Sequence, residues 1–206
     1  MQRHRPCSIV AFAACLSCAL PASAARVETE NEVVDAIWRV QEFDFHFRTS
    51  GRYHSCTSLH SKITAILREI GAGEVVVQLA CAPNSLTNNT FARVATATPV
   101  QASTQNIEAA TTYDSRQQLT ARLRQIQLPS AADIDRFPAQ WREVTLSNNR
   151  RLQLGRHDCD LLQDLTRQIL PHLSVRIVRK RLNCGSPTLD PANPVLVVSA
   201  LVKRAT

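Results

Sequence analysis

The chain carries one cysteine pattern twice. Cys56 and Cys81 lie 25 residues apart, and Cys159 and Cys184 repeat this separation 103 residues later. When residues 36–102 are shifted by 103 positions without a gap, 16 of the 67 residues coincide with identical ones. A repeat of this length indicates an internal duplication, in which each copy forms one supersecondary unit.

The first 24 residues have the composition of a secretory signal peptide. Two arginines near the start precede a short apolar run from Ile9 to Leu20, and Ala22-Ser23-Ala24 supplies an A-x-A cleavage pattern. The run is too short to span a membrane, and no later segment approaches about 18 consecutive apolar residues. We expect an exported protein, periplasmic or secreted, whose mature chain has no transmembrane segment. A lipoprotein anchored at Cys15 or Cys18 is the alternative.

Cleavage after the leader removes three of the seven cysteines and leaves the two repeated pairs. An even number of cysteines in an oxidising compartment indicates disulfides, but four cysteines allow three pairings. In the first copy, residues 57–70 have helical spacing and residues 74–80 alternate as a strand, so the returning strand ends beside the start of the helix. The second copy repeats this order. The predicted pairs are Cys56–Cys81 and Cys159–Cys184.

Each copy is predicted to be a β-α-β-β unit, and the fold class is α+β. The two units are expected to pack with pseudo-two-fold symmetry, each stapled by one disulfide. A unit of about 70 residues is near the lower limit for an unaided core, so the copies need each other. The expected strands are residues 38–47, 74–80 and 91–100 in the first copy and 141–146, 178–182 and 195–202 in the second; the second helix is marked by Leu162, Leu165, Ile169, Leu170 and Leu173.

The predicted organisation has a linker between the repeats. Residues 25–103 form the first repeat, 104–138 a partly helical linker and 139–206 the second repeat, with 25–206 as one compact domain. The start of the linker, from Ser103 to Thr112, is polar. After it, Asp114 or Ser115 is expected to cap a helix that carries leucines at helical spacing and ends before Pro129; a short helical turn is expected at residues 131–136.

Basic residues gather in the second repeat. The chain has 24 Lys plus Arg against 17 Asp plus Glu, and loss of Arg3 and Arg5 with the leader leaves 22 − 17 = +5. The densest group could bind an anionic envelope component such as lipid phosphate or acidic polysaccharide. Its simpler interpretation is a solvated strand whose charges keep a sheet edge from pairing. Nucleic acid is not favoured, because no aromatic residues interleave with the basic ones. The candidate anion-binding residues are Arg176, Arg179, Lys180 and Arg181.

A histidine stands two residues before the first cysteine of each pair, at His54 and His157. Imidazole together with thiolate suits copper(I) or zinc, which makes metal handling or thiol chemistry an alternative function. Each copy offers only one His and two Cys, without the close spacing of a tetrahedral site. Disulfide formation would also remove the thiolates, so the simpler interpretation is that both histidines are hydrogen-bonding or surface residues.

Catalytic motifs are absent from the sequence. There is no G-x-S-x-G, no H-E-x-x-H and no glycine-rich phosphate loop. The reactive-looking segment from His157 to Asp160 is more simply explained if Asp158 or Asp160 caps the following helix. We therefore expect a protein that acts by binding rather than by catalysis, and that needs no cofactor.

Three segments resemble an uncharacterised family of bacterial exported proteins. They are Tyr53-His54-Ser55-Cys56-x-x-Leu59, the helix end Ala65-Ile66-Leu67-Arg68-x-Ile70-Gly71-Ala72, and Asp158-Cys159-Asp160-Leu161-Leu162. The resemblance implies localisation in the bacterial envelope and supplies no activity. The predicted function is thus a disulfide-stabilised, non-catalytic binding or accessory protein whose partner, a protein or an anionic envelope component, is not identified by the sequence.

Overall fold

The computed structural model describes residues 32–49, 52–147, 149–184 and 194–204. The predicted signal peptide lies outside these ranges. Within them, no helix is both long enough and apolar enough to cross a membrane.

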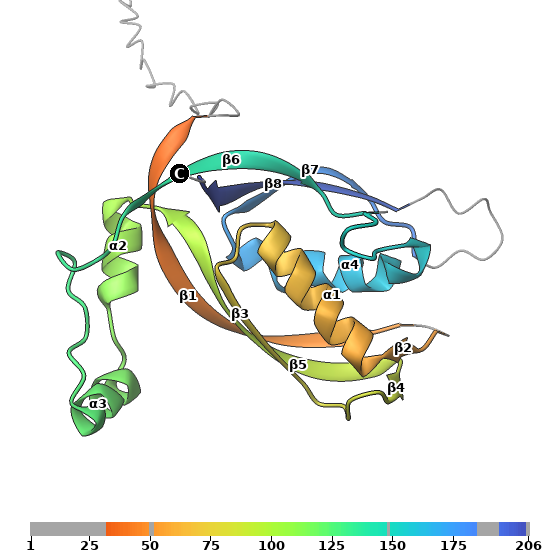
Figure 1. Ribbon diagram of the computed structural model, residues 1–206, viewed down its shortest axis with the longest axis horizontal. Coiled ribbons are helices and arrows are strands. Elements are labelled where there is room, and N and C mark those ends of the chain that lie inside the picture. Colours follow the sequence, from red (N-terminus) through yellow and green to blue (C-terminus); the bar gives the residue numbers. More distant parts are fainter. Residues whose placement is uncertain (1–31, 50–51, 148, 185–193, 205–206) are drawn as a thin grey trace, which may run out of the picture.

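The described residues form an α+β fold around one antiparallel six-stranded sheet, as the sequence predicts at this coarse level. The sheet curves around the helices α1 (Cys56–Glu69) and α4 (Cys159–Gln168), as Figure 1 shows. A separate two-stranded ladder joins β2 (His54–Ser55) to β4 (Leu86–Thr87). Along the large sheet the strands follow the order β3 (Glu74–Leu79), β5 (Asn89–Gln101), β1 (Val33–Arg48), β6 (Phe137–Thr145), β8 (Val195–Lys203) and β7 (Val175–Arg181).

Local sequence explains both ends of α1. Ser55 is the N-cap, and its hydroxyl oxygen accepts a hydrogen bond from the Ser58 N–H. At the other end Gly71 has φ +97°, a left-handed conformation that a residue without Cβ adopts at little cost. The Ala72 N–H then donates to the Leu67 carbonyl and closes the last turn. The helix therefore stops where the sequence predicts.

The second helix is shorter than the apolar spacing indicates. The expected pattern continues to Leu173, but α4 ends at Gln168 and a 3-10 turn, η2 (Leu170–His172), follows. Pro171 explains the change, since it has no N–H to donate and its ring would clash with the carbonyl four residues earlier. The buried leucines after α4 still reach the core through this turn.

The linker contains one helix that the sequence analysis missed. In the segment expected to be merely polar, α2 (Thr104–Thr111) forms without burying any residue, and its cap is Ser103. The hydrogen bond at its N-cap, rather than a pattern of apolar residues, therefore marks the position of α2. The predicted helix after it is α3 (Ser115–Arg124), in which Asp114 and Gln117 form a reciprocal capping box. The helical turn expected at 131–136 is wrong, because the structure has only a hydrogen-bonded turn from Ser130 to Asp133.

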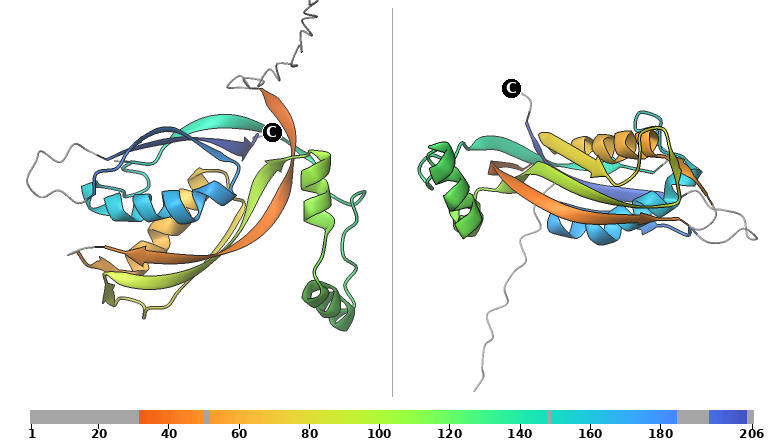
Figure 2. Two further views of the ribbon diagram at one scale, coloured as in Figure 1. Left: turned by 180° about the vertical axis from the view of Figure 1, so that it is seen from behind. Right: turned by 90° about the horizontal axis from the view of Figure 1, so that it is seen from below.

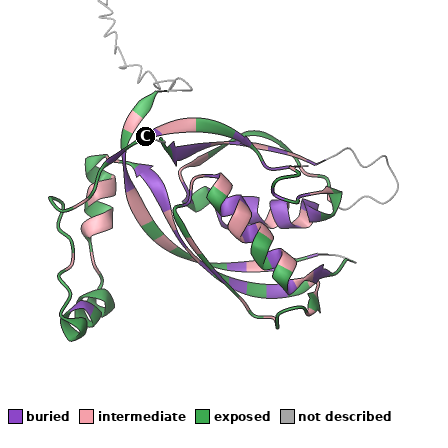
Figure 3. Cartoon of the chain, viewed as in Figure 1, coloured by how far each residue is buried: buried purple, intermediate pink, exposed green. Residues whose placement is uncertain are grey.

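One apolar core unites residues from both ends of the chain. Phe45 and Ile63 from the first half belong to the same buried cluster as Leu161, Leu165 and Val198 from the second. Figure 3 shows this burial on α1 and α4, whereas α3 is mostly exposed and α2 combines exposed and half-buried residues. Figure 2 shows that α2 and α3 lie on the opposite side of β1 from α1 and α4.

The two halves share only a short ladder in the sheet. Strand β1 pairs with β5 from Ala36 to Arg48 but with β6 only from Val33 to Ala36. Beyond Ala36 the β6-facing edge of β1 has no strand partner among the described residues. Its backbone groups must be satisfied in another way.

Both disulfides join the pairs that the sequence predicts. Cys56 bridges Cys81 and Cys159 bridges Cys184, with Cα atoms 6.3 and 5.4 Å apart. Each bridge connects the first residue of a helix to a segment that follows the returning strand. In the chain-entropy description, closing a loop of this size stabilises the fold by about 3 kcal/mol.

Replacing Gly71 with alanine should destabilise the protein. A Cβ at this position would lie 2.7 Å from the Leu201 carbonyl oxygen, and φ +97° is unfavourable for alanine. We expect Gly71→Ala to lower the free energy of unfolding by about 1–3 kcal/mol in urea titrations. Gly155→Ala is the matched control: nothing lies within 4 Å of its added Cβ, so its effect should stay within about 0.5 kcal/mol. Equal effects of the two substitutions would contradict the assigned role of Gly71.

Candidate functional site

A buried polar cluster lies where the two halves meet. Asp158, which precedes α4, is only 2% exposed, and its Oδ1 accepts a hydrogen bond from the Lys62 ammonium of α1 at 2.6 Å. The Gly155 N–H donates to Asp158 Oδ2 at 2.9 Å. Asp158 makes no side-chain bond that caps α4, so its expected capping role is wrong. It is instead the counter-ion of a lysine in the other half.

His54 belongs to the same cluster. Its Nδ1 lies 4.0 Å from Asp158 Oδ1, and its ring meets Phe47 edge-on with centroids 5.2 Å apart. Its Nε2 is buried and has no hydrogen-bond partner among the residues that the structure describes. Burial lowers the pKa of His54, and the nearby Lys62 adds to this effect, whereas Asp158 opposes it. The neutral imidazole is therefore the favoured form in the folded protein.

The second histidine is at the same junction but in a different contact. His157 Nδ1 is hydrogen-bonded to the guanidinium of Arg52. All four repeated cysteines are in disulfides, so neither His-x-Cys pair has a thiolate. Among the residues that the structure describes, no group of three or more His, Cys, Asp or Glu side chains is arranged to hold a metal ion.

Side chains of α4 satisfy the open edge of β1. The Gln168 amide bonds both the N–H and the carbonyl of His46, at 2.9 and 2.8 Å. Asp164 Oδ2 accepts from the Arg48 N–H at 3.1 Å, and the Thr49 hydroxyl donates to Asp160. Burial raises the pKa of Asp164, and the Arg48 N–H opposes this shift.

The three α4 residues in these bonds, Asp160, Asp164 and Gln168, are spaced four residues apart, so they form one stripe along the helix. The spacing is visible in the sequence, but the sequence does not indicate that these side chains bond the edge of β1. Asp160, a candidate helix cap by its position in the sequence, instead accepts a hydrogen bond from Thr49.

The basic strand β7 is an outer edge of the sheet. Opposite residues of an antiparallel pair lie on the same face. Arg176, Arg179 and Arg181 oppose Ser199, Val197 and Val195, whereas Lys180 opposes Leu196 of the core. The three arginines therefore point away from the helices, and Lys180 is on the opposite face.

A β-bulge produces this alignment. The register shifts between Ile177 and Arg179, so Val178 has no residue directly opposite it. With strict alternation, Arg176 would share a face with Val178 and Lys180 rather than with the other arginines. The structure thus divides the four candidate anion-binding residues into a row of three and one on the other face.

Aromatic rings of β6 lie beside this basic face. The Arg176 guanidinium lies 4.1 Å from the centroid of the Trp141 ring, and the Lys203 ammonium lies 5.3 Å from that of Phe137. Such cation–π contacts hold the charged groups in place over apolar surface. The outer face of the second half therefore combines basic groups with aromatic support.

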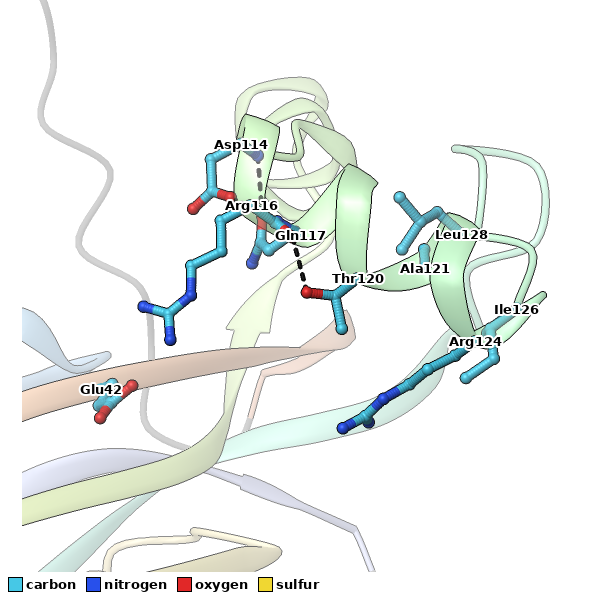
Figure 4. Close-up of a pocket in the computed structure, with 9 residues that line it drawn as sticks. All are labelled: Glu42, Asp114, Arg116, Gln117, Thr120, Ala121, Arg124, Ile126 and Leu128. Atoms are coloured by element: carbon cyan, nitrogen blue, oxygen red, sulfur yellow. Dashed lines mark hydrogen bonds between the residues drawn. The ribbon is translucent and has the colours of Figure 1, made fainter.

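A separate hollow lies between α3 and β1. It has a volume of about 440 Å³ and is lined by Glu42 on β1 and by a set of α3 and loop residues that includes Arg116 and Arg124. Figure 4 shows both arginines extending from α3 on the side of Glu42. The sequence indicates α3 but not its position relative to β1, so this hollow cannot be predicted from the sequence.

No known protein family, curated protein or solved structure matches the chain. The resemblance to a family of exported proteins therefore stays a prediction.

Separating Lys62 from Asp158 should cost more than breaking an exposed ion pair. Asp158→Asn and Lys62→Met should each lower the free energy of unfolding by about 2–3 kcal/mol, because each leaves one buried charge without its partner. The double variant should lose clearly less than the sum of the two. Arg151→Met is the control: Arg151 is largely exposed in its pair with Glu69, so the loss should stay below about 1 kcal/mol. Additive effects in the Lys62–Asp158 cycle would contradict the coupling.

Acid should destabilise the wild type through His54. Its pKa in the folded state is below the ordinary value of 6.5, so the unfolded chain takes up a proton at a pH where the folded protein does not. The free energy of unfolding should therefore fall as the pH drops below 6.5. Urea titrations of wild type and His54→Gln at several pH values between about 5 and 7.5 test this. The difference between the two proteins should change with pH, and parallel pH profiles would exclude His54 as the cause.

Proposed function

We propose that the protein is an exported, disulfide-stabilised binding protein of the bacterial envelope that recognises an anionic partner through the outer face of β7. The observation that carries this proposal is the bulge-aligned row of Arg176, Arg179 and Arg181. Three guanidinium groups on one face of an exposed strand can donate paired hydrogen bonds to phosphate or carboxylate groups. Partners of this chemistry include lipid phosphate and acidic polysaccharide.

Two features support export. The A-x-A pattern of the leader predicts secretion, and the two disulfides are typical of proteins that fold in an oxidising compartment.

We also propose that the two halves are a duplication related by a pseudo-two-fold axis. The pairing of β1 with β6 supports it: Val34 opposes Ala139 and Ala36 opposes Phe137. A shift of 103 residues converts each of these pairs into the other. Asp35 opposes Pro138, its own counterpart under the shift, as expected for a pair at a two-fold axis.

Binding is favoured over thiol or metal chemistry by the state of the cysteines. A function that uses the His-x-Cys pairs through thiolates would first require reduction of both disulfides. The arginine row needs no such step. The two repeats then differ in role, because the position of Arg179 in the second repeat corresponds to Val76 in the first.

Charge reversal on the outer face should weaken binding to an acidic matrix. We expect the purified exported protein to be retained on an acidic polysaccharide column and to elute with salt, as electrostatic binding requires. Arg179→Glu/Arg181→Glu should elute at clearly lower salt than wild type. Lys180→Glu should have a smaller effect, since this side chain is on the other face.

Arg136→Glu/Arg150→Glu is the matched control for net charge. Both residues are exposed and lie outside β7. This variant carries the same total charge as Arg179→Glu/Arg181→Glu but should retain most of the binding. Equal loss in the two double variants would mean that net charge alone causes retention, and it would overturn the proposed site.

A further inference from the structure

The hollow between α3 and β1 has walls of opposite charge. Arg116 and Arg124 line it on the side of α3, and Glu42 lines it on the side of β1. A second hollow, of about 490 Å³, adjoins the first, because Glu42 and Arg116 line both. Its other charged residues are Asp44 and Arg93. The wall on the sheet therefore carries two carboxylates and one guanidinium, whereas α3 contributes two guanidinium groups.

The charges of the two walls do not pair with each other. Arg93 Nε lies 3.2 Å from Glu42 Oε1 and 3.6 Å from Asp44 Oδ1, so the ion pairs stay within the sheet. In the part of the chain that the structure describes, the guanidinium groups of Arg116 and Arg124 have neither an ion-pair nor a hydrogen-bond partner. Figure 4 shows both side chains extending from α3 on the side of Glu42. Space between the walls is therefore left for a ligand.

The two arginines belong to one stripe of α3. Arg116, Thr120 and Arg124 follow at intervals of four residues, so their side chains lie along the same side of the helix, and all three line the hollow. Guanidinium groups donate paired N–H bonds that match the geometry of a carboxylate. This wall is therefore suited to a carboxylate ligand.

The helix end supplies an apolar part of the same hollow. Beyond α3, the Ile126 N–H donates to the Ala121 carbonyl at 2.9 Å, which turns the chain back beside the last turn. Figure 4 shows Ala121, Ile126 and Leu128 together at this end. The Tyr113 hydroxyl also donates to the Pro129 carbonyl at 2.9 Å and so ties the two flanks of α3 together. The hollow is thus preformed, with an apolar end next to its charged walls.

We propose that this hollow binds a small zwitterion with an apolar side chain: a free α-amino acid or a short peptide. Its carboxylate accepts hydrogen bonds from Arg116 and Arg124, and its ammonium group donates to Glu42. Its apolar side chain packs against Ile126 and Leu128. The site is separate from the arginine row of β7, so neither proposal depends on the other.

Both ligand charges are needed to match this lining. A simple anion would satisfy the two arginines but would lie beside the carboxylate of Glu42, and a simple cation would lie beside two guanidinium groups. Like charges brought together in this way oppose binding. Glu42 can accept a further hydrogen bond while it pairs with Arg93, because a carboxylate has about four acceptor sites. The volume of about 440 Å³ is also within the range of about 300–1,000 Å³ typical of small-molecule sites.

NMR titration of the purified exported protein tests the ligand class. L-Leucine and L-leucyl-L-leucine are the probes, and we expect saturable shifts of α3 amides with Kd of about 0.1–1 mM, since the hollow is open to solvent. The tighter of the two probes identifies the source as free amino acids or peptides. N-acetyl-L-leucine and L-leucinamide each lack one charge and should bind at least about tenfold more weakly. Absence of saturable binding by both probes, or equal affinity for leucine and either blocked form, would overturn the proposal.

Substitutions in the lining identify the site. Arg116→Gln/Arg124→Gln should weaken leucine binding at least about tenfold, and Glu42→Gln should remove the preference for leucine over N-acetyl-L-leucine. Arg122→Gln/Arg136→Gln is the matched control, because it removes the same charge from two exposed residues that do not line the hollow. This control should bind leucine like wild type. Equal weakening by both double variants would mean that net charge alone is responsible, and it would overturn the assigned site.

Discussion

The short ladder between β1 and β6 is the constraint on which the rest of the structure depends. Only Val33 to Ala36 of β1 pair with β6, and beyond them the two halves of the sheet diverge. A sheet that separates in this way exposes backbone donors and acceptors at an inner edge, which is costly unless they find partners. The polar stripe of α4 supplies these partners, while the apolar core shared by α1 and α4 holds the two halves together. Each draws residues from both ends of the chain.

The stripe of α4 takes the place that a further strand would have in a continuous sheet. A helix cannot offer its own backbone to a strand edge, because its N–H and C=O groups already bond within the helix. Side chains at every fourth position can do so, and Gln168 presents a donor and an acceptor just as a neighbouring peptide group would. The Lys62–Asp158 pair adds a second link close by. The framework made in this way keeps the outer faces of both half-sheets outside the shared core.

Local signals predict much of this fold from the sequence. The apolar period and Gly71 define α1, Asp114 defines the start of α3, and the return of a strand along its helix predicts the disulfide pairing. Long-range polar contacts are not predictable in the same way. Nothing near Lys62 in the sequence indicates that its partner is Asp158, and Asp160 has the position of an ordinary helix cap. The bulge at Val178 also departs from the alternation of a regular strand. The sequence therefore does not show that the four basic residues are divided between the two faces of β7.

The way in which α4 closes the edge of β1 also affects motion. Strands within either half are held to each other by continuous backbone ladders, which open only when many hydrogen bonds break together. Within the sheet, the halves meet through four paired residues and through side-chain bonds that can break singly, and the shared apolar core lies beneath this junction. Local opening should therefore begin at this seam, with each half-sheet moving as an intact unit. Bending at the β1–β6 ladder would change the angle between the outer faces of the two half-sheets, while the backbone ladders within each half stay intact.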